Sequence, residues 1–93
     1  LRAAVEAFLG SNYLRTVEIL AKQEFAEARA SAVALLLRGA ARYALYLEGA
    51  KRDDALLRAA DADVRTCRRI APSLAPDPAF FSPAYSEFFR TAK

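Results

Sequence analysis

Residues 60–72 read ADADVRTCRRIAP. Within this stretch Ala60, Val64, Cys67 and Ile70 recur at helical spacing, so small or apolar side chains form one stripe along a helix. Pro72 follows, and because proline has no backbone N–H it ends the helix there. The stretch therefore predicts a helix that buries one narrow face against a neighbour.

The composition points to an all-α protein. The chain has 93 residues and 55% hydrophobic content, much of it alanine, the best helix former. The longest apolar run, residues 32–37, is followed by Arg38 and is too short to span a bilayer, which takes about 20 residues. The net charge of +3 is interleaved along the chain and is not typical of a nucleic-acid-binding protein. The one cysteine excludes an intramolecular disulfide.

The periodicity predicts five helices, over residues 1–9, 13–23, 26–48, 54–71 and 83–91. Gly10 suits a left-handed helix stop, and Ser11 or Asn12 suits the cap of the next helix. Asp53 is the expected N-cap of the fourth helix, and Ser82 followed by proline begins the last one.

The third predicted helix is apolar almost all round between residues 33 and 47, apart from Arg38 and Arg42. Such a helix is buried on more than one side. In the fourth helix the stripe continues from Leu57 to Ala71, and Leu56 and Ile70 are expected to widen it. Its acidic residues fall in the first half and its arginines in the second, which matches the helix dipole.

These two helices resemble a tetratricopeptide (TPR) unit, a pair of antiparallel helices with a sparse pattern of large and small residues. The matching positions are Leu36, Ala40, Tyr43, Ala60, Val64, Cys67 and Pro72. Gly39 stands where leucine is usual, and the two halves fit only with an insertion around residues 50–56. Residues 8–20 resemble the pattern more loosely, through Phe8, Leu9, Gly10, Tyr13, Val17 and Leu20, so the resemblance covers about residues 1–72.

The resemblance implies two stacked antiparallel hairpins, residues 1–24 and 26–72, within a single domain. Residues 73–93 would then form a proline-bounded connector and a short capping helix. It also implies a non-enzymatic protein–protein interaction module, whose binding side is formed by the first and third helices. The runs 42–49, 72–78 and 81–83 look like TPR-like domains of exported bacterial proteins, which favours an exported or periplasmic location over the cytoplasm.

Arg38 and Arg42 lie one helical turn apart and are the first candidates for partner binding. Some TPR domains hold a peptide carboxylate with such a pair. Alternatively, both side chains extend to solvent at the edge of a buried helix. Tyr43 and Tyr46 are expected to pack between helices with their hydroxyls near the surface, and Tyr46 is a further candidate for partner contact.

The C-terminal aromatic residues offer a second choice. We expect them to cap the last hairpin, because a stack of repeats otherwise exposes an apolar face. Alternatively, they form an exposed patch for a partner or for a homodimer. The aromatic residues are Phe80, Phe81, Tyr85, Phe88 and Phe89, and the partner-binding candidates among them are Phe81, Phe88 and Phe89.

No pattern for catalysis, a cofactor or a metal ion is found, so the chain is not expected to be an enzyme. Cys67 is expected to be an inert buried thiol, and the sequence has no histidine to activate it. The acidic residues Asp53, Asp54, Asp61 and Asp63 are attributed mainly to the helix dipole. The basic residues Arg65, Arg68 and Arg69 form too small a patch for nucleic acid.

Two other functions remain open from the sequence. The chain could be a self-associating structural domain, with a homodimer interface made by the third helix and the C-terminal aromatics. It could also be an accessory domain of a larger enzyme.

Overall fold

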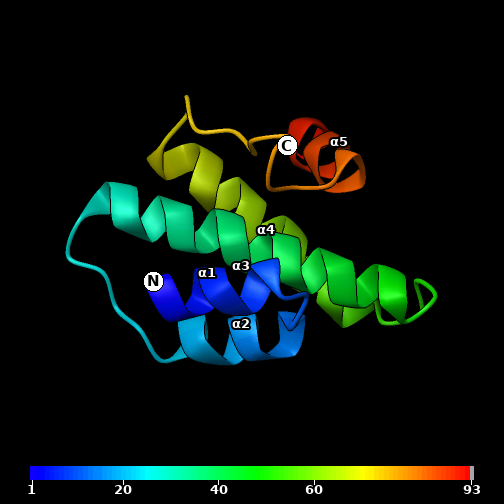
Figure 1. The fold of residues 1–93 in the computed structure, drawn as a ribbon. Helices are drawn as coiled ribbons and strands as arrows, with labels where there is room; N and C mark the ends of the chain where they lie inside the picture. Colours follow the sequence, from blue (N-terminus) through cyan, green and yellow to red (C-terminus); the bar gives the residue numbers. More distant parts are fainter. Residues whose placement is uncertain (93) are drawn as a thin grey trace.

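The computed structural model describes residues 1–92 and is built from α-helices (Figure 1). The five helices within these residues are α1 (Arg2–Leu9), α2 (Tyr13–Ala21), α3 (Ala28–Glu48), α4 (Asp54–Ile70) and α5 (Pro83–Thr91). The predicted all-α class is confirmed. The bounds differ most around the link between α2 and α3, where helix was expected to continue to residue 23 and to resume at 26.

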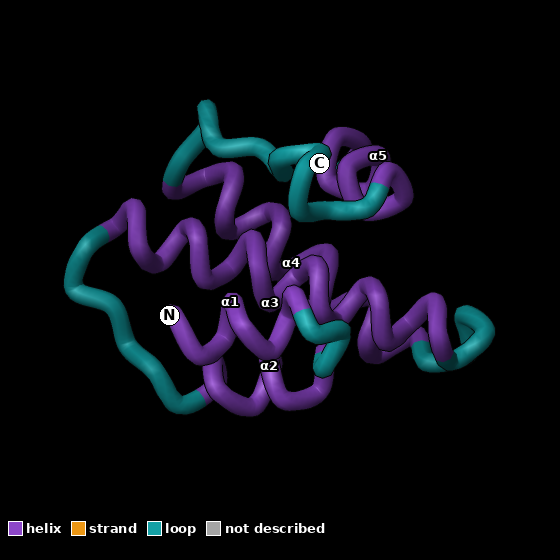
Figure 2. Tube along the Cα trace, in the orientation of Figure 1, coloured by secondary structure: helices purple, strands orange, loops and turns teal. Residues whose placement is uncertain are grey.

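Helix α3 lies in the middle of the molecule, between the α1–α2 hairpin and the α4–α5 side (Figures 1 and 2). Leu37 packs with Ala4 and Leu20 of the first hairpin. The neighbouring Leu36 packs with residues of α4 and α5, including Val64. Consecutive residues of α3 thus face different layers, which confirms that this helix is buried on more than one side.

The stripe in α4 is buried as predicted. Ala60, Val64 and Cys67 are each 0% exposed. Ile70 does not widen this stripe, because its side chain is 38% exposed while the half-buried Ala71 packs against the core instead. Ala71 lies four residues after Cys67 and Ile70 three residues after it. The spacing of four places Ala71 closer to the buried face of the helix than Ile70.

Both hairpin turns use a positive φ at a residue other than glycine. Gly10 has φ −84° and the left-handed residue is Ser11, with φ 60°. The amide of Asn12 donates to the carbonyl of Ala7 (2.8 Å), and that of Ser11 donates to Phe8 (3.0 Å). These are the bonds of a Schellman motif, whose left-handed position follows the C-cap. The expectation that Gly10 is left-handed was therefore wrong by one position.

The predicted N-caps are confirmed. The Asn12 side chain accepts a hydrogen bond from the amide of Arg15 (3.3 Å), and Asp53 accepts from the amide of Ala55 (3.1 Å). Ser82 accepts from the amide of Tyr85 (3.1 Å) and fixes the start of α5. Within residues 1–92 no helix is long and apolar enough to cross a membrane.

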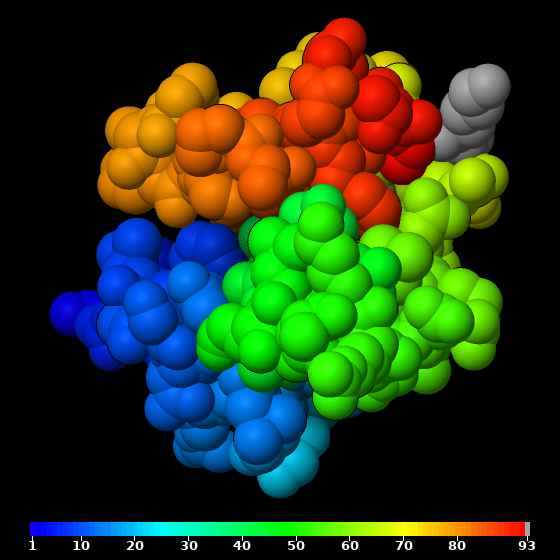
Figure 3. All heavy atoms as spheres, turned by 90° about the vertical axis from the view of Figure 1, so that its right-hand side faces the viewer, coloured from blue at the N-terminus to red at the C-terminus, as the bar shows by residue number. Residues whose placement is uncertain are grey.

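Helix α5 covers the outer side of the second hairpin, as predicted for a capping helix. Tyr85 and Phe89 are 2% and 6% exposed, and both belong to the core shared with α3 and α4. In the side view of Figure 3 the connector and α5 lie across the top of the molecule, above α1 and the turn between α3 and α4.

Candidate functional site

Arg38 and Arg42 both bind Asp63 of α4. Nε and Nη2 of Arg38 donate to the two carboxylate oxygens of Asp63 at 3.0 and 2.7 Å, and Nη1 of Arg42 donates at 2.9 Å. The Asp63 side chain is 5% exposed, whereas those of Arg38 and Arg42 are 26% and 22% exposed. The hydrogen bond to Asp63 raises the pKa of Arg38. The carboxylate that occupies this pair is therefore part of the same chain.

This cluster changes the interpretation of Asp63, which the sequence analysis attributed to the helix dipole. Asp63 lies three residues after Ala60 and four before Cys67, so it falls on the buried stripe of α4. A carboxylate on a buried stripe needs a charged partner. That position, together with two arginines on an apolar helix, was the available signal for the cluster. Binding of a partner's carboxylate by Arg38 and Arg42 stays a prediction, and such a partner would compete with Asp63.

The aromatic candidates form one connected cluster between α3 and α5. Phe88 stacks on Tyr43 with ring centroids 4.3 Å apart and planes at 13°, and Tyr46 lies 6.0 Å from Tyr43 on the same helix. Phe81 contacts Phe8 of α1, with centroids 5.3 Å apart. Phe80 is the exception in this segment, because its side chain is 58% exposed.

Tyr85 connects α5 to α3 through a buried hydrogen bond. Its hydroxyl donates to the carbonyl of Leu36 (2.7 Å), and burial raises the pKa of this phenol well above its ordinary value. Gly39 makes the approach possible, since a Cβ at that position would lie 3.0 Å from the Tyr85 hydroxyl oxygen and 3.4 Å from Asp63 Cβ. The glycine that departs from the TPR pattern is thus the contact point of α3, α4 and α5.

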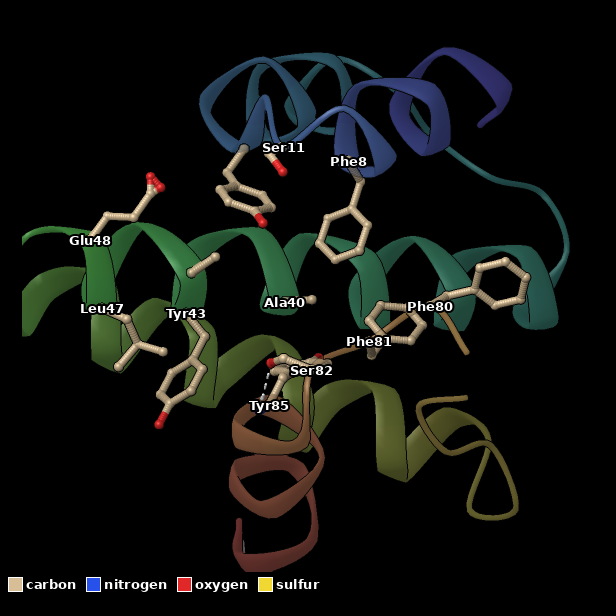
Figure 4. A pocket seen from close by; sticks show the side chains of 12 residues that line it. Phe8, Ser11, Ala40, Tyr43, Leu47, Glu48, Phe80, Phe81, Ser82 and Tyr85 are labelled. Atoms are coloured by element: carbon tan, nitrogen blue, oxygen red, sulfur yellow. Dashed lines mark hydrogen bonds between the residues drawn. The ribbon is translucent and has the colours of Figure 1, made fainter. Parts of the chain in front are cut away.

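A groove of about 460 Å³ opens beside this contact, between α1, α3 and the connector that leads into α5 (Figure 4). Its size is in the range of sites that bind small ligands or a few side chains. In Figure 4 Phe8 points from α1 toward Phe81, and Glu48 rises at the end of α3 toward the α1–α2 hairpin. Figure 3 shows the surface hollowed where the connector, α1 and α3 meet. The lining residues are Phe8, Ser11, Tyr13, Ala40, Tyr43, Ala44, Leu47, Glu48, Phe80, Phe81, Ser82 and Tyr85.

Arg65 and Arg68 of α4 are engaged with neighbouring groups of the chain. Arg65 forms an ion pair with Asp61 at 2.6 Å, one helical turn away. Arg68 donates to the carbonyls of Phe89 (3.2 Å) and Ala92, and its guanidinium lies 5.9 Å from the centroid of the Phe89 ring. Arg68 therefore satisfies the C-terminal end of α5, a role that the sequence analysis missed.

Cys67 is buried as predicted, and burial followed by the charge of Asp63 raises the pKa of its thiol. A thiol in this setting is a poor nucleophile, since the reactive form is the thiolate. Among residues 1–92 the structure contains no group of three or more Cys, Asp or Glu side chains that could hold a metal ion.

Comparison with protein-family models, with curated proteins and with solved structures gives no match to this chain. The residues and their geometry are therefore the basis for the function.

Proposed function

We propose that this chain is a protein–protein interaction domain of the TPR type, without catalytic activity of its own. The observation that carries the proposal is the groove between α1, α3 and the C-terminal segment, since the first and third helices, which were predicted to form the binding side, supply part of its lining. Its walls come from separate helices that are fixed by two buried clusters. A preformed groove lowers the entropic cost of binding, since little must be ordered when a partner arrives.

The chemistry of the groove supports binding rather than reaction. Its lining is mainly aromatic and aliphatic, and the polar groups that line it are hydroxyls and one carboxylate. The single thiol, Cys67, is buried in the packed interface between α3 and α4 and is not among the lining residues. Aromatic side chains in a concave surface are typical of contacts that contribute most to binding energy.

The experiment compares two tryptophan substitutions in the full chain. Ala44→Trp fills the groove, whereas Ala62→Trp places the same ring on the exposed face of α4. Each immobilised variant is incubated with extract from the native cell, and bound proteins are identified by mass spectrometry. We expect A62W and the unmodified chain to retain the same partner and A44W to lose it. Retention by all three, or turnover of a small molecule without any bound protein, contradicts the proposal.

The alternative is a homodimer through α3 and the C-terminal aromatics, and most of the aromatic surface that it would use is already buried within one chain. Tyr85 and Phe89 are nearly fully buried within one chain, and Phe80 is the large exposed member of the aromatic group. Light scattering over a wide concentration range decides between the two, because a monomer at high concentration rejects the homodimer. An accessory role in a larger enzyme stays an alternative that the full-length gene would decide.

A further inference from the structure

The groove has a charge at one end that its neighbours do not neutralise. Glu48 is the one charged side chain among the twelve residues that line it. Within residues 1–92 no basic side-chain nitrogen lies within 4.0 Å of the Glu48 carboxylate, although Lys51 and Arg52 follow in the next turn. Helix α3 has three arginines: Arg38 and Arg42 are directed to Asp63, and Arg29 lies at the opposite end of the helix from Glu48.

The aromatic walls favour the same kind of ligand as this carboxylate. Tyr13 lines the groove next to Phe8, and the face of an aromatic ring attracts cations, whereas the ring of Tyr43 is stacked on Phe88 and contributes apolar surface. The small side chains of Ala40 and Ala44 leave room above α3. A bound group that is apolar along its length and positive at its tip would satisfy both features.

Lysine and arginine side chains have this form, with an apolar stem and a charged head. The other end of the groove is lined by Phe8, Phe80 and Phe81, which can take an apolar side chain. Phe80 in particular is 58% exposed and has apolar surface to bury. A carboxylate-bearing ligand is disfavoured, because Glu48 would repel it.

We propose that the groove binds a segment of a partner protein in which a lysine or arginine lies next to a large apolar residue. The basic head pairs with Glu48, and the apolar neighbour packs against Phe80 and Phe81. This inference rests on the proposed function, since it specifies the partner chemistry for the same groove.

The test uses the full chain labelled with ¹⁵N and acetylated, amidated hexapeptides titrated to millimolar concentration. One peptide carries a central Phe-Arg pair and a second carries Arg-Phe, so either chain direction is sampled. In the matched controls citrulline replaces arginine, which keeps the shape and removes the charge. We expect shifts of the amides of Tyr43, Ala44 and Glu48 with an arginine peptide, and affinity lower by about fivefold with citrulline.

Two variants locate the effect. Glu48→Gln is expected to abolish the difference between arginine and citrulline peptides. Glu6→Gln, which removes an exposed carboxylate of α1 that pairs with Arg2, is expected to leave the difference intact. High salt should also reduce the difference, because the charges are near solvent.

The inference is overturned if both peptides bind equally, if the preference for arginine persists in E48Q, or if no peptide shifts the groove amides. It is also overturned if these amides shift with protein concentration alone, because a second copy would then occupy the groove. None of these outcomes decides the proposed function, which depends on whether A44W loses a protein partner that A62W keeps.

Discussion

Asp63 is a small residue whose replacement is expected to lower the free energy of unfolding strongly. Asp63→Asn removes one buried negative charge and replaces one of the two oxygens that accept three hydrogen bonds from Arg38 and Arg42 with an NH2 group, which cannot accept them. Breaking a buried ion pair by removing one partner costs about 3–5 kcal/mol. Both arginines are partly exposed, so the lower figure of about 3 kcal/mol applies. A chain of this length has a total stability of roughly 5–14 kcal/mol, so the loss is a large fraction.

The control lies on the same helix. Asp61→Asn removes a carboxylate that pairs with Arg65 across one helical turn, where both side chains are substantially exposed. Such pairs contribute about 0.3–0.5 kcal/mol. The assay is urea unfolding followed by far-ultraviolet circular dichroism, with the free energy extrapolated to water. If D63N lies within about 1 kcal/mol of D61N, the buried cluster has no special role and the reasoning fails.

A combined variant separates charge burial from packing. Replacing Asp63 with leucine and both Arg38 and Arg42 with methionine removes the whole cluster and leaves no unpaired charge. Replacement of a buried ionic cluster by apolar side chains of similar volume is often neutral or stabilising. We therefore expect the triple variant to be more stable than D63N. Stability equal to or below that of D63N would contradict the explanation that D63N is costly because it leaves buried charge unpaired.

Three further predictions concern the core and the turns. Gly39→Ala alone is expected to destabilise the protein, because its Cβ would lie 3.0 Å from the Tyr85 hydroxyl oxygen. In the Tyr85→Phe background the same change should stabilise the protein by up to about 1 kcal/mol, the difference in helix propensity between alanine and glycine. Urea unfolding of the unmodified protein, the two single variants and the double variant checks this reversal of sign. Burial keeps the Cys67 thiol protonated in the folded chain above its ordinary pKa of 9.0, so at alkaline pH the folded state binds more protons than the unfolded state. The contribution of this thiol to the unfolding free energy is therefore constant well below pH 9.0 and falls as the pH rises above it. A Cys67→Ala variant should show a smaller fall in the same titration, and an equal fall would exclude the thiol as a source. Ala50 has φ 60°, so Ala50→Gly should relieve about 0.5–1 kcal/mol of backbone strain and raise the thermal midpoint of unfolding. The backbone at position 49 has φ −82°, which any residue can adopt, so the control Gly49→Ala should not lower the midpoint.

The features that the sequence predicted are those set by neighbours within one or two helical turns. The stripe of Ala60, Val64 and Cys67 is visible as a period in the chain, and the capping roles of Asn12 and Asp53 depend on amides two or three residues away. Such features need no knowledge of which helices pack together. They account for the all-α class and for the helix bounds to within a few residues.

The features that the sequence analysis missed join residues far apart in the chain. Asp63 and Arg38 are 25 residues apart, and Arg68 reaches a carbonyl 21 residues further on. The groove likewise needs α1, α3 and the connector in place before its lining can be named. The residue types in each helix determine which contacts are chemically possible, but the packing of the helices determines which of them form. For this reason the sequence draws attention to Arg38 and Arg42 as a pair but does not identify Asp63 as their acceptor.

Gly39 shows how a departure from a repeat pattern can carry structural meaning. A leucine at this position would place its side chain where the Tyr85 hydroxyl and Asp63 Cβ now lie. The glycine therefore allows α5 to reach the backbone of α3, where Tyr85 donates to the carbonyl of Leu36. That bond brings Tyr85 into the wall of the groove, and Phe81 contacts its ring at 5.7 Å. Because the same contact fixes α5 and one wall of the groove, α5 is an integral part of the proposed binding surface as well as a cap.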